Sequence, residues 1–146
     1  MHNAKFTMRN WLARFCILHF AFCIGCSIPN LEPTDCIQAR DIVREFYSFH
    51  FGNDMNFSAE NLERRRRFLT TDLYERLKSE EQKGDPFTRT SDLPKAFRVG
   101  ECRVVESGVS FNVLLFWKTD TRTEQKSINV LAENIGDKWL IAWVKD

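Results

Sequence analysis

Residues 109–117 constrain the fold of this chain more than any other stretch of its sequence. Every second residue there is apolar and would point to one side of an extended strand: Val109, Phe111, Val113, Leu115 and Trp117. The positions between them begin polar, at Ser110 and Asn112. This period of two predicts a β-strand that is buried along one face.

Helical patterns precede this strand, and further strand patterns flank it. Helices are expected over residues 36–51, 58–68 and 72–83, with Asp35 and Ser58 as N-caps of the first two. Strands are expected over residues 96–106, 109–118, 125–133 and 138–144. In the last of these, Trp139, Ile141 and Trp143 are expected to share a face. Helices followed by a four-strand meander predict an α+β fold.

The first 25 residues are typical of a targeting segment rather than of a folded domain. They begin with basic residues and no acid, and residues 15–24 form an apolar run that only His19 interrupts. Such a run is too short for a membrane span, which needs about 20 residues, but it suits the core of a signal peptide. An uncleaved anchor over residues 11–28 is the alternative, although Arg14 and His19 make it costly.

The targeting segment ends in Cys-Ile-Gly-Cys at residues 23–26, which resembles the lipobox of bacterial lipoproteins. In that motif a small residue precedes the lipidated cysteine, here Cys26, and Cys23 departs from the leucine usual at its position. The resemblance implies a signal peptide over residues 1–25, a tether over 26–34 and a domain over 35–146. Lipid on Cys26 would hold the domain on a membrane of the cell envelope, in the periplasm or outside. A plain secretory signal, with Cys26 as an ordinary thiol, is the alternative.

Cleavage after residue 25 changes both charge and cysteine count. Lys and Arg would fall from 21 to 18 against 20 acids, giving a net charge near −2, so a nucleic-acid partner is not expected. If Cys26 carries lipid, Cys36 and Cys102 remain as an even pair in an oxidising compartment. They form either a disulfide or two unpaired buried thiols.

Short motifs along residues 36–144 resemble the nuclear-transport-factor-2-like superfamily, and more closely its exported bacterial group known as domain of unknown function 3828. The motifs are FLT at 68–70, LYERL at 73–77, GDPF at 84–87, SD at 91–92, FRVG at 97–100 and DKWLI at 137–141. The resemblance implies three N-terminal helices packed into the concave side of a curved four-stranded antiparallel sheet, like the wall of a cone. It brings no catalytic motif, and the fold alone does not decide function.

Enzymes of this superfamily place a carboxylate, tyrosine or histidine inside the cone, so the catalytic candidates are Tyr47, His50 and Glu101. Glu101 and Arg103 are two residues apart, and uninterrupted alternation puts them on one face with Phe97 and Val99. A charged pair among apolar neighbours would mark a site. A solvated edge strand or a surface salt bridge explains the pair equally well.

A binding role predicts a different set of residues. Its candidates are aromatic or charged side chains expected along the cone: Tyr47, Tyr74, Arg103 and Trp117. The partner would be a small apolar ligand, another protein, or a second copy docked on the outer face of the sheet. Residues 64–67 are four consecutive arginines, either a solvated helix or a contact for an anionic partner.

Cofactor and metal chemistry is not expected. One histidine and no Cys-x-x-Cys after residue 26 leave no zinc ligand set, and the glycines form no phosphate-binding loop. The sequence therefore favours a cell-envelope lipoprotein whose domain binds a small ligand or a protein without catalysis. A small enzyme of the isomerase, dehydratase or hydrolase type is the alternative.

Overall fold

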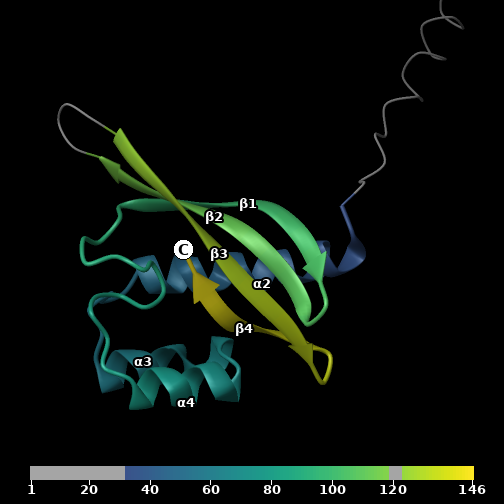
Figure 1. Cartoon of the computed structure of the whole chain (residues 1–146), viewed down its shortest axis with the longest axis horizontal. Helices are drawn as coiled ribbons and strands as arrows, with labels where there is room; N and C mark the ends of the chain where they lie inside the picture. Colours follow the sequence, from purple (N-terminus) through teal and green to yellow (C-terminus); the bar gives the residue numbers. More distant parts are fainter. Residues whose placement is uncertain (1–31, 119–122) are drawn as a thin grey trace, which may run out of the picture. The chain divides into compact units, whose positions relative to one another are not determined.

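The computed structural model describes residues 32–118 and 123–146. Three helices and a short 3₁₀ turn come first: α2 (Thr34–Phe51), α3 (Ala59–Arg65), η1 (Arg66–Phe68) and α4 (Thr71–Ser79). The strands follow as β1 (Ala96–Val105), β2 (Gly108–Lys118), β3 (Thr123–Ile135) and β4 (Lys138–Lys145). They form one antiparallel sheet in the order β1-β2-β3-β4. This confirms the expected α+β fold (Figure 1).

The targeting segment and Cys26 lie outside the described residues. Within the part of the chain that is described, no helix is both long and apolar enough to cross a membrane.

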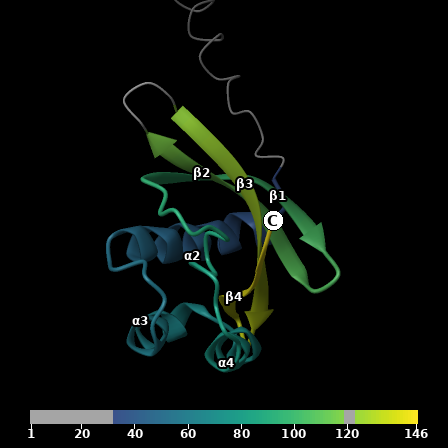
Figure 2. The same ribbon diagram turned by 60° about the vertical axis from the view of Figure 1, so that its left-hand side comes forward.

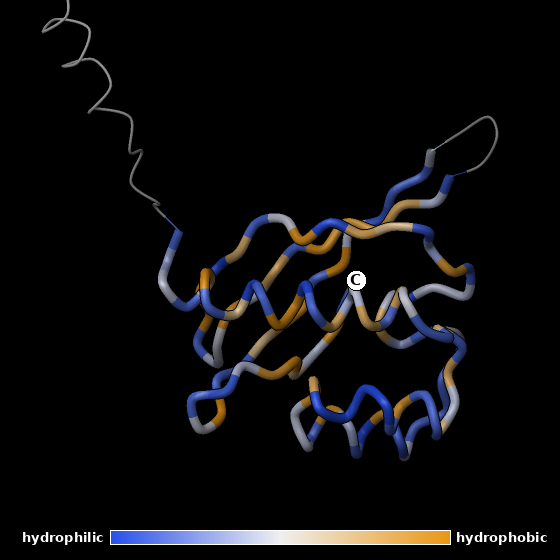
Figure 3. The backbone as a smooth tube through the Cα atoms, turned by 180° about the vertical axis from the view of Figure 1, so that it is seen from behind, coloured by the Kyte–Doolittle hydropathy of each residue, from blue (hydrophilic) through white to orange (hydrophobic). Residues whose placement is uncertain are grey.

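The two central strands carry the alternation that their sequences predict. Val109, Phe111, Val113 and Leu115 of β2 are fully buried, and so are Ile128, Val130 and Ala132 of β3. Helix α2 runs across this inner face (Figures 1 and 2), where its buried residues recur every three or four positions. In Figure 3, hydrophobic and hydrophilic segments accordingly alternate along α2 and the strands. Burying each large apolar side chain stabilises the fold by about 1.5–3 kcal/mol.

Edge strand β1 departs from simple alternation because it contains a bulge. Its register with β2 shifts between Val99 and Cys102, so that Cys102 pairs with Phe111 and faces inward. Glu101 and Arg103 consequently lie on the outer face of the sheet. The prediction that they share a face with Phe97 and Val99 is therefore wrong.

Edge strand β4 contains a second register shift, opposite Leu131 and Ala132 of β3. Ile141 pairs with Ala132 on the inner face, whereas Trp143 pairs with Leu131 on the outer face. The prediction that Trp143 shares a face with Ile141 is wrong for the same reason as in β1. An extra residue in an edge strand reverses every later side chain.

The helix ends follow local capping chemistry. The Ser58 side chain accepts a hydrogen bond from the Asn61 amide at 3.1 Å, which confirms the predicted cap. Asp35 is not an N-cap, because α2 begins at Thr34 after Pro33, whose fixed φ already suits a helical start. Helix α4 ends at Ser79 rather than at residue 83, because no apolar residue after Leu77 prolongs its buried face.

Two links hold neighbouring elements to the sheet. At the start of α2, a disulfide joins Cys36 to Cys102 with Cα atoms 5.8 Å apart, and the β1 bulge is what turns Cys102 toward the helix. At the other edge, the Thr70 amide donates to the Ile141 carbonyl at 2.9 Å. This contact covers the free edge of β4 and sets α4 beside the end of that strand.

Candidate functional site

A cluster of buried polar side chains lies at the junction of α2, α3 and the loop after Gly84. His50, Arg65 and Asp85 are only 1%, 2% and 5% exposed. We call these three residues the inner polar cluster. Arg65 reaches it because it follows the buried Leu62 by three positions and so lies on the inner side of α3.

Hydrogen bonds occupy both ring nitrogens of His50. The Arg65 Nε–H donates to His50 Nδ1 at 2.8 Å, and His50 Nε2 lies 2.8 Å from Asp85 Oδ2. Because Nδ1 accepts a hydrogen bond, it carries no proton, and the geometry assigns the proton to Nε2, which donates to Asp85. His50 is therefore a neutral bridge between a cation and a carboxylate, with no lone pair left for a substrate.

The remaining donors and acceptors of the cluster are also engaged. Arg65 Nη1 and Nη2 each donate to a backbone carbonyl at 2.7 Å, those of Asn61 and Asp54. Asp85 also accepts hydrogen bonds from Thr88 Oγ1 at 2.7 Å and from the Phe87 amide at 3.1 Å. Such saturation makes a buried polar group tolerable.

Tyr47 lies close to this cluster and is equally engaged. Its hydroxyl donates to the Phe87 carbonyl at 2.8 Å. Burial, and then the negative charge of Asp85, raise the pKa of Tyr47 well above its ordinary value of 10.0. Burial lowers the pKa of the Arg65 guanidinium, an effect that Asp85 opposes. Tyr47 is thus a neutral side chain whose hydroxyl proton is hydrogen-bonded to the Phe87 carbonyl.

Little space remains beside these side chains. A hollow bordered by His50, Asn61, Arg65 and Asp85 has a volume of about 10 Å³. That is at the lower limit for a single water molecule. Aromatic rings fill the neighbouring space, where Phe46 lies 5.0 Å from Phe87 between ring centroids and Tyr47 lies 5.6 Å from Phe97.

The other predicted site residues lie apart from Tyr47 and His50. The side chains of Glu101 and Arg103 are 85% and 81% exposed on the outer face of the sheet, 3.9 Å apart. The structure does not bring Glu101 to the cone. The Tyr74 hydroxyl donates to Glu63 Oε2 at 2.5 Å, a bond that raises the pKa of Tyr74.

Trp117 lies at the end of β2, half-buried. Its Nε1–H donates to the Asp92 carbonyl at 3.2 Å, and its ring lines a shallow groove with Arg89 and Lys126. Tyr47, Tyr74, Arg103 and Trp117 therefore do not form one shared site.

The four consecutive arginines at residues 64–67 differ in burial. Arg64, Arg66 and Arg67 are exposed, whereas Arg65 is buried. Arg67 lies over the Phe68 ring with 4.6 Å between Cζ and the ring centroid. The exposed members therefore cover apolar rings as a solvated helix surface does.

A further hollow lies between α4, the loop before β1 and the end of β4. It has a volume of about 330 Å³, and we call it the α4–β4 cleft. Its apolar walls come from Leu73, Leu77, Pro86, Phe87, Trp143 and Val144. Its polar lining comes from Arg76, Glu80, Gln82, Arg89, Lys145 and Asp146. The lining therefore combines apolar side chains with six polar ones, five of which are charged.

Two cations of the cleft lie against the Trp143 ring. The Cζ atom of Arg76 lies 3.3 Å from the ring centroid, and the Nζ atom of Lys145 lies 5.0 Å from it. Burial lowers the pKa of Arg76, while the carboxylates of Glu80 and Asp72 oppose that change. The third cation, Arg89, has a left-handed backbone with φ of 56°.

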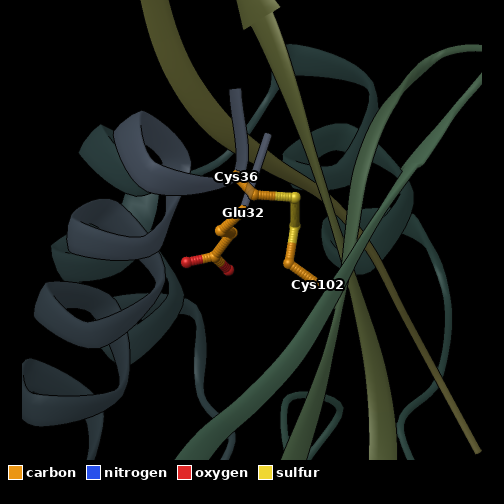
Figure 4. Close-up of side chains that lie close together, drawn as sticks. All are labelled: Glu32, Cys36 and Cys102. Carbon is orange, nitrogen blue, oxygen red and sulfur yellow. A yellow bond between two sulfur atoms is a disulfide. The ribbon is translucent and has the colours of Figure 1, made fainter. Parts of the chain in front are cut away.

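One group of potential metal ligands occurs among the described residues (Figure 4). Atoms of Glu32, Cys36 and Cys102 lie within 4.8 Å of one another. Both sulfurs belong to the disulfide, and a cysteine binds metal as a thiolate. In the disulfide form this group is not a metal site. The Glu32 carboxylate instead pairs with Arg40, whose Nη1 donates to the bulge carbonyl of Gly100 at 2.8 Å.

Comparison with known proteins supports the fold and no activity. No family model matches the chain, and no curated protein matches it. A solved protein of unknown function from Bacteroides thetaiotaomicron is similar in structure, with 22% identity and a TM-score of 0.56 over 75% of this chain and 89% of that one. The Ntf2-like potential transfer protein TraM from the Gram-positive conjugative plasmid pIP501 has 15% identity and a TM-score of 0.48, over 73% and 91%.

Sequence reasoning singled out His50 but missed its partners. Arg65 carries a signal, because it lies three residues after Leu62 and four before Leu69, on the apolar phase of the helix. Asp85 carries a weaker one in the Gly-Asp-Pro turn. The cleft residues Arg76 and Arg89 carry none, because the cleft joins segments that only the tertiary fold brings together.

Proposed function

We propose that this chain is a binding module of the bacterial cell envelope, of the nuclear-transport-factor-2-like kind and related to the exported group of domain of unknown function 3828. It holds a ligand without transforming it. The observation that carries this proposal is the saturation of His50, whose two nitrogens are bonded to Arg65 and Asp85. A general base needs a free lone pair within reach of its substrate.

The state of the other catalytic candidates supports the same conclusion. Tyr47 has its proton committed to the Phe87 carbonyl, and Glu101 is exposed on the outer face of the sheet. Side chains fill the space between α2 and the sheet, where enzymes of this superfamily would keep an open cavity. A ligand therefore fits better in the α4–β4 cleft than beside the inner polar cluster.

Equilibrium dialysis of the purified protein against a mixture of small metabolites tests this proposal, with mass spectrometry on both chambers. A binding module concentrates a compound on the protein side while the total amount of every compound stays constant. An enzyme would deplete a compound and produce a new mass over many turnovers. Depletion that disappears in His50→Gln would overturn the proposal in favour of the cone enzyme, and enrichment of no compound would overturn it as well.

The proposed cellular address rests on residues 1–26, separately from the domain. Lipid on Cys26 would tether the domain to a membrane through the short stretch before α2. Intact-mass measurement of the membrane fraction from a bacterial host tests it. A product that begins at Cys26 and carries diacylglycerol plus an acyl chain supports the anchor, whereas an unmodified full-length chain in the soluble fraction contradicts it.

A second copy docked on the outer face of the sheet is one of the partners that the sequence leaves open, and we include it in the proposal. Its outer face has a groove of about 200 Å³, with Val105, Leu131 and Trp143 among the lining residues. Light scattering of the purified protein tests this part of the proposal. A dimer that Leu131→Glu converts to a monomer supports it, and a monomeric wild type contradicts it.

A further inference from the structure

We propose that the α4–β4 cleft binds a small organic oxyanion, a compound with an apolar body and a carboxylate or phosphate group. The inference rests on the proposed binding function and names the chemical class of its ligand. It follows from the charges of the lining, from the apolar walls, and from the backbone of Arg89.

The balance of charge in the cleft is positive. Arg76, Arg89 and Lys145 face two carboxylates, those of Glu80 and Asp146. Asp146 is already paired, because its carboxylate lies 2.6 Å from Lys126 Nζ. Three cations therefore oppose the carboxylate of Glu80 and, near Arg76, that of Asp72. The balance stays positive, and a bound oxyanion would relieve the mutual repulsion of the cations.

Arg76 is held against an aromatic ring, and its side chain donates no hydrogen bond to residues 32–118 or 123–146. Its Cζ atom lies 3.3 Å from the centroid of the Trp143 ring. A contact this close restricts the side chain, and the N–H groups of a guanidinium point outward from its edge. A restricted guanidinium binds a carboxylate or phosphate through two parallel hydrogen bonds at a reduced cost in entropy.

Arg89 occupies a backbone conformation that favours glycine. Its φ of 56° lies in the left-handed region, and the turn is fixed by bonds from the Arg89 amide to the Asp85 carbonyl and from Lys126 Nζ to the Arg89 carbonyl. An arginine there is less favourable for folding than a glycine. Strained residues of this kind cluster at ligand sites, and here the side chain lines the cleft.

The walls and the volume specify the rest of the ligand. Leu73, Leu77 and Phe87 contribute to the apolar part of the lining. About 330 Å³ is at the small end of the range for small-molecule sites, which suits a single ring or a short chain that carries one oxyanion.

Calorimetric titration of the purified full-length protein tests the inference with three phenyl compounds of similar size: benzoate, phenyl phosphate and benzamide, which is the neutral isostere of benzoate. We expect at least one of the two anions to bind at least tenfold more tightly than benzamide. The tighter anion identifies the head group as a carboxylate or a phosphate. Equal affinity for benzamide, or no heat from either anion, would overturn the inference.

Variants of the cleft show whether the anion binds there. Arg89→Gly removes the cation while relieving the backbone, so it should keep or raise the melting temperature and weaken anion binding at least tenfold. Arg76→Gln should weaken it similarly. Arg44→Gln on the exposed side of α2 is the matched control and should leave affinity unchanged.

Unchanged affinity in Arg89→Gly and Arg76→Gln would contradict the proposal. If neutral metabolites are enriched in dialysis while these anions fail to bind, the binding function stands and the oxyanion site does not.

Discussion

Arg65 packs against the loop that follows Gly84, and Arg89 is part of that loop, yet one side chain is buried and the other lines a cleft. Arg65 is buried, and its Nε, Nη1 and Nη2 atoms all donate to acceptors within 2.8 Å. Arg89 lines an open cleft on a strained backbone, where only its main chain makes the hydrogen bonds that we describe. A buried cation whose donors are all engaged stabilises the fold, whereas Arg89 is the kind of cation that the proposed oxyanion would contact.

The largest expected effect comes from removing the inner cation. Arg65→Ala leaves Asp85 and His50 buried with an unpaired acceptor, so we expect a loss of about 3–5 kcal/mol in the free energy of unfolding. Urea denaturation followed by circular dichroism measures it. Arg64→Ala, the exposed neighbour, is the matched control and should change stability by no more than about 0.5 kcal/mol. Similar losses for both would show that Arg65 contributes only as part of the helix surface.

The disulfide lies at the start of α2, whereas His50 lies at the end of that helix. Removal of the disulfide shows how much stability comes from a region outside the inner polar cluster. Reduction of Cys36–Cys102, which are 66 residues apart, should cost about 2–4 kcal/mol because the unfolded chain gains freedom. Urea denaturation with and without reductant measures this loss. Because the bridge lies away from the α4–β4 cleft, benzoate affinity should stay constant in the reduced, still folded protein. A weaker affinity would mean that the cleft depends on the position of α2.

The pH dependence of the free energy of unfolding reports on the burial of Tyr47. The raised pKa means that the folded state keeps the Tyr47 proton after the unfolded chain begins to release it near pH 10. Its stabilising contribution is therefore fully present below pH 10 and is lost as the pH rises toward the folded-state pKa. Tyr47→Phe should cost about 1 kcal/mol at pH 8, through the lost bond to Phe87, and should lose less stability than the wild type between pH 8 and 11.

Urea denaturation at both pH values measures that contrast. The comparison uses the difference between the two proteins, because Tyr74 also has a raised pKa and contributes in the same direction. Equal losses in Tyr47→Phe and the wild type would show that the Tyr47 hydroxyl is not shielded from solvent.

The smallest expected effect comes from the outer arginine. Arg89→Gly relieves a left-handed backbone but adds freedom to the unfolded chain, so the two terms nearly cancel. We expect a free energy of unfolding within about 0.5 kcal/mol of the wild type, on the stabilising side. Arg89→Ala, which keeps the strain, should be no more stable than the wild type. A large loss in Arg89→Gly would place Arg89 with Arg65 among the structural cations.

The sequence was sufficient for the central strands and misleading for the edge strands. Residues of β2 and β3 alternate without interruption because each of these strands pairs on both sides, which fixes their register. The bulges in β1 and β4 reverse Glu101 and Trp143 relative to simple alternation, and only Gly100 in β1 hints at one. A missed bulge leaves the predicted fold class correct, but it makes the predicted face of a candidate residue wrong.

The candidate site was less predictable for a related reason. Tyr47 and His50 were recognisable as helix residues facing the core, but the partners that saturate His50 lie 15 and 35 residues away. Their contact depends on how α3 and the Gly84 loop pack against α2. The cleft likewise combines α4 with the last residues of β4, two segments whose sequences carry no common motif.

Chemical-shift mapping of the isotope-labelled protein during a benzoate titration distinguishes a ligand in the α4–β4 cleft from one at the inner polar cluster. We expect the largest shifts at Arg76, Arg89 and the Trp143 indole, with His50 and Arg65 unchanged. Shifts that concentrate instead at Tyr47, His50 and Arg65 would contradict this expectation and would place the site inside the cone.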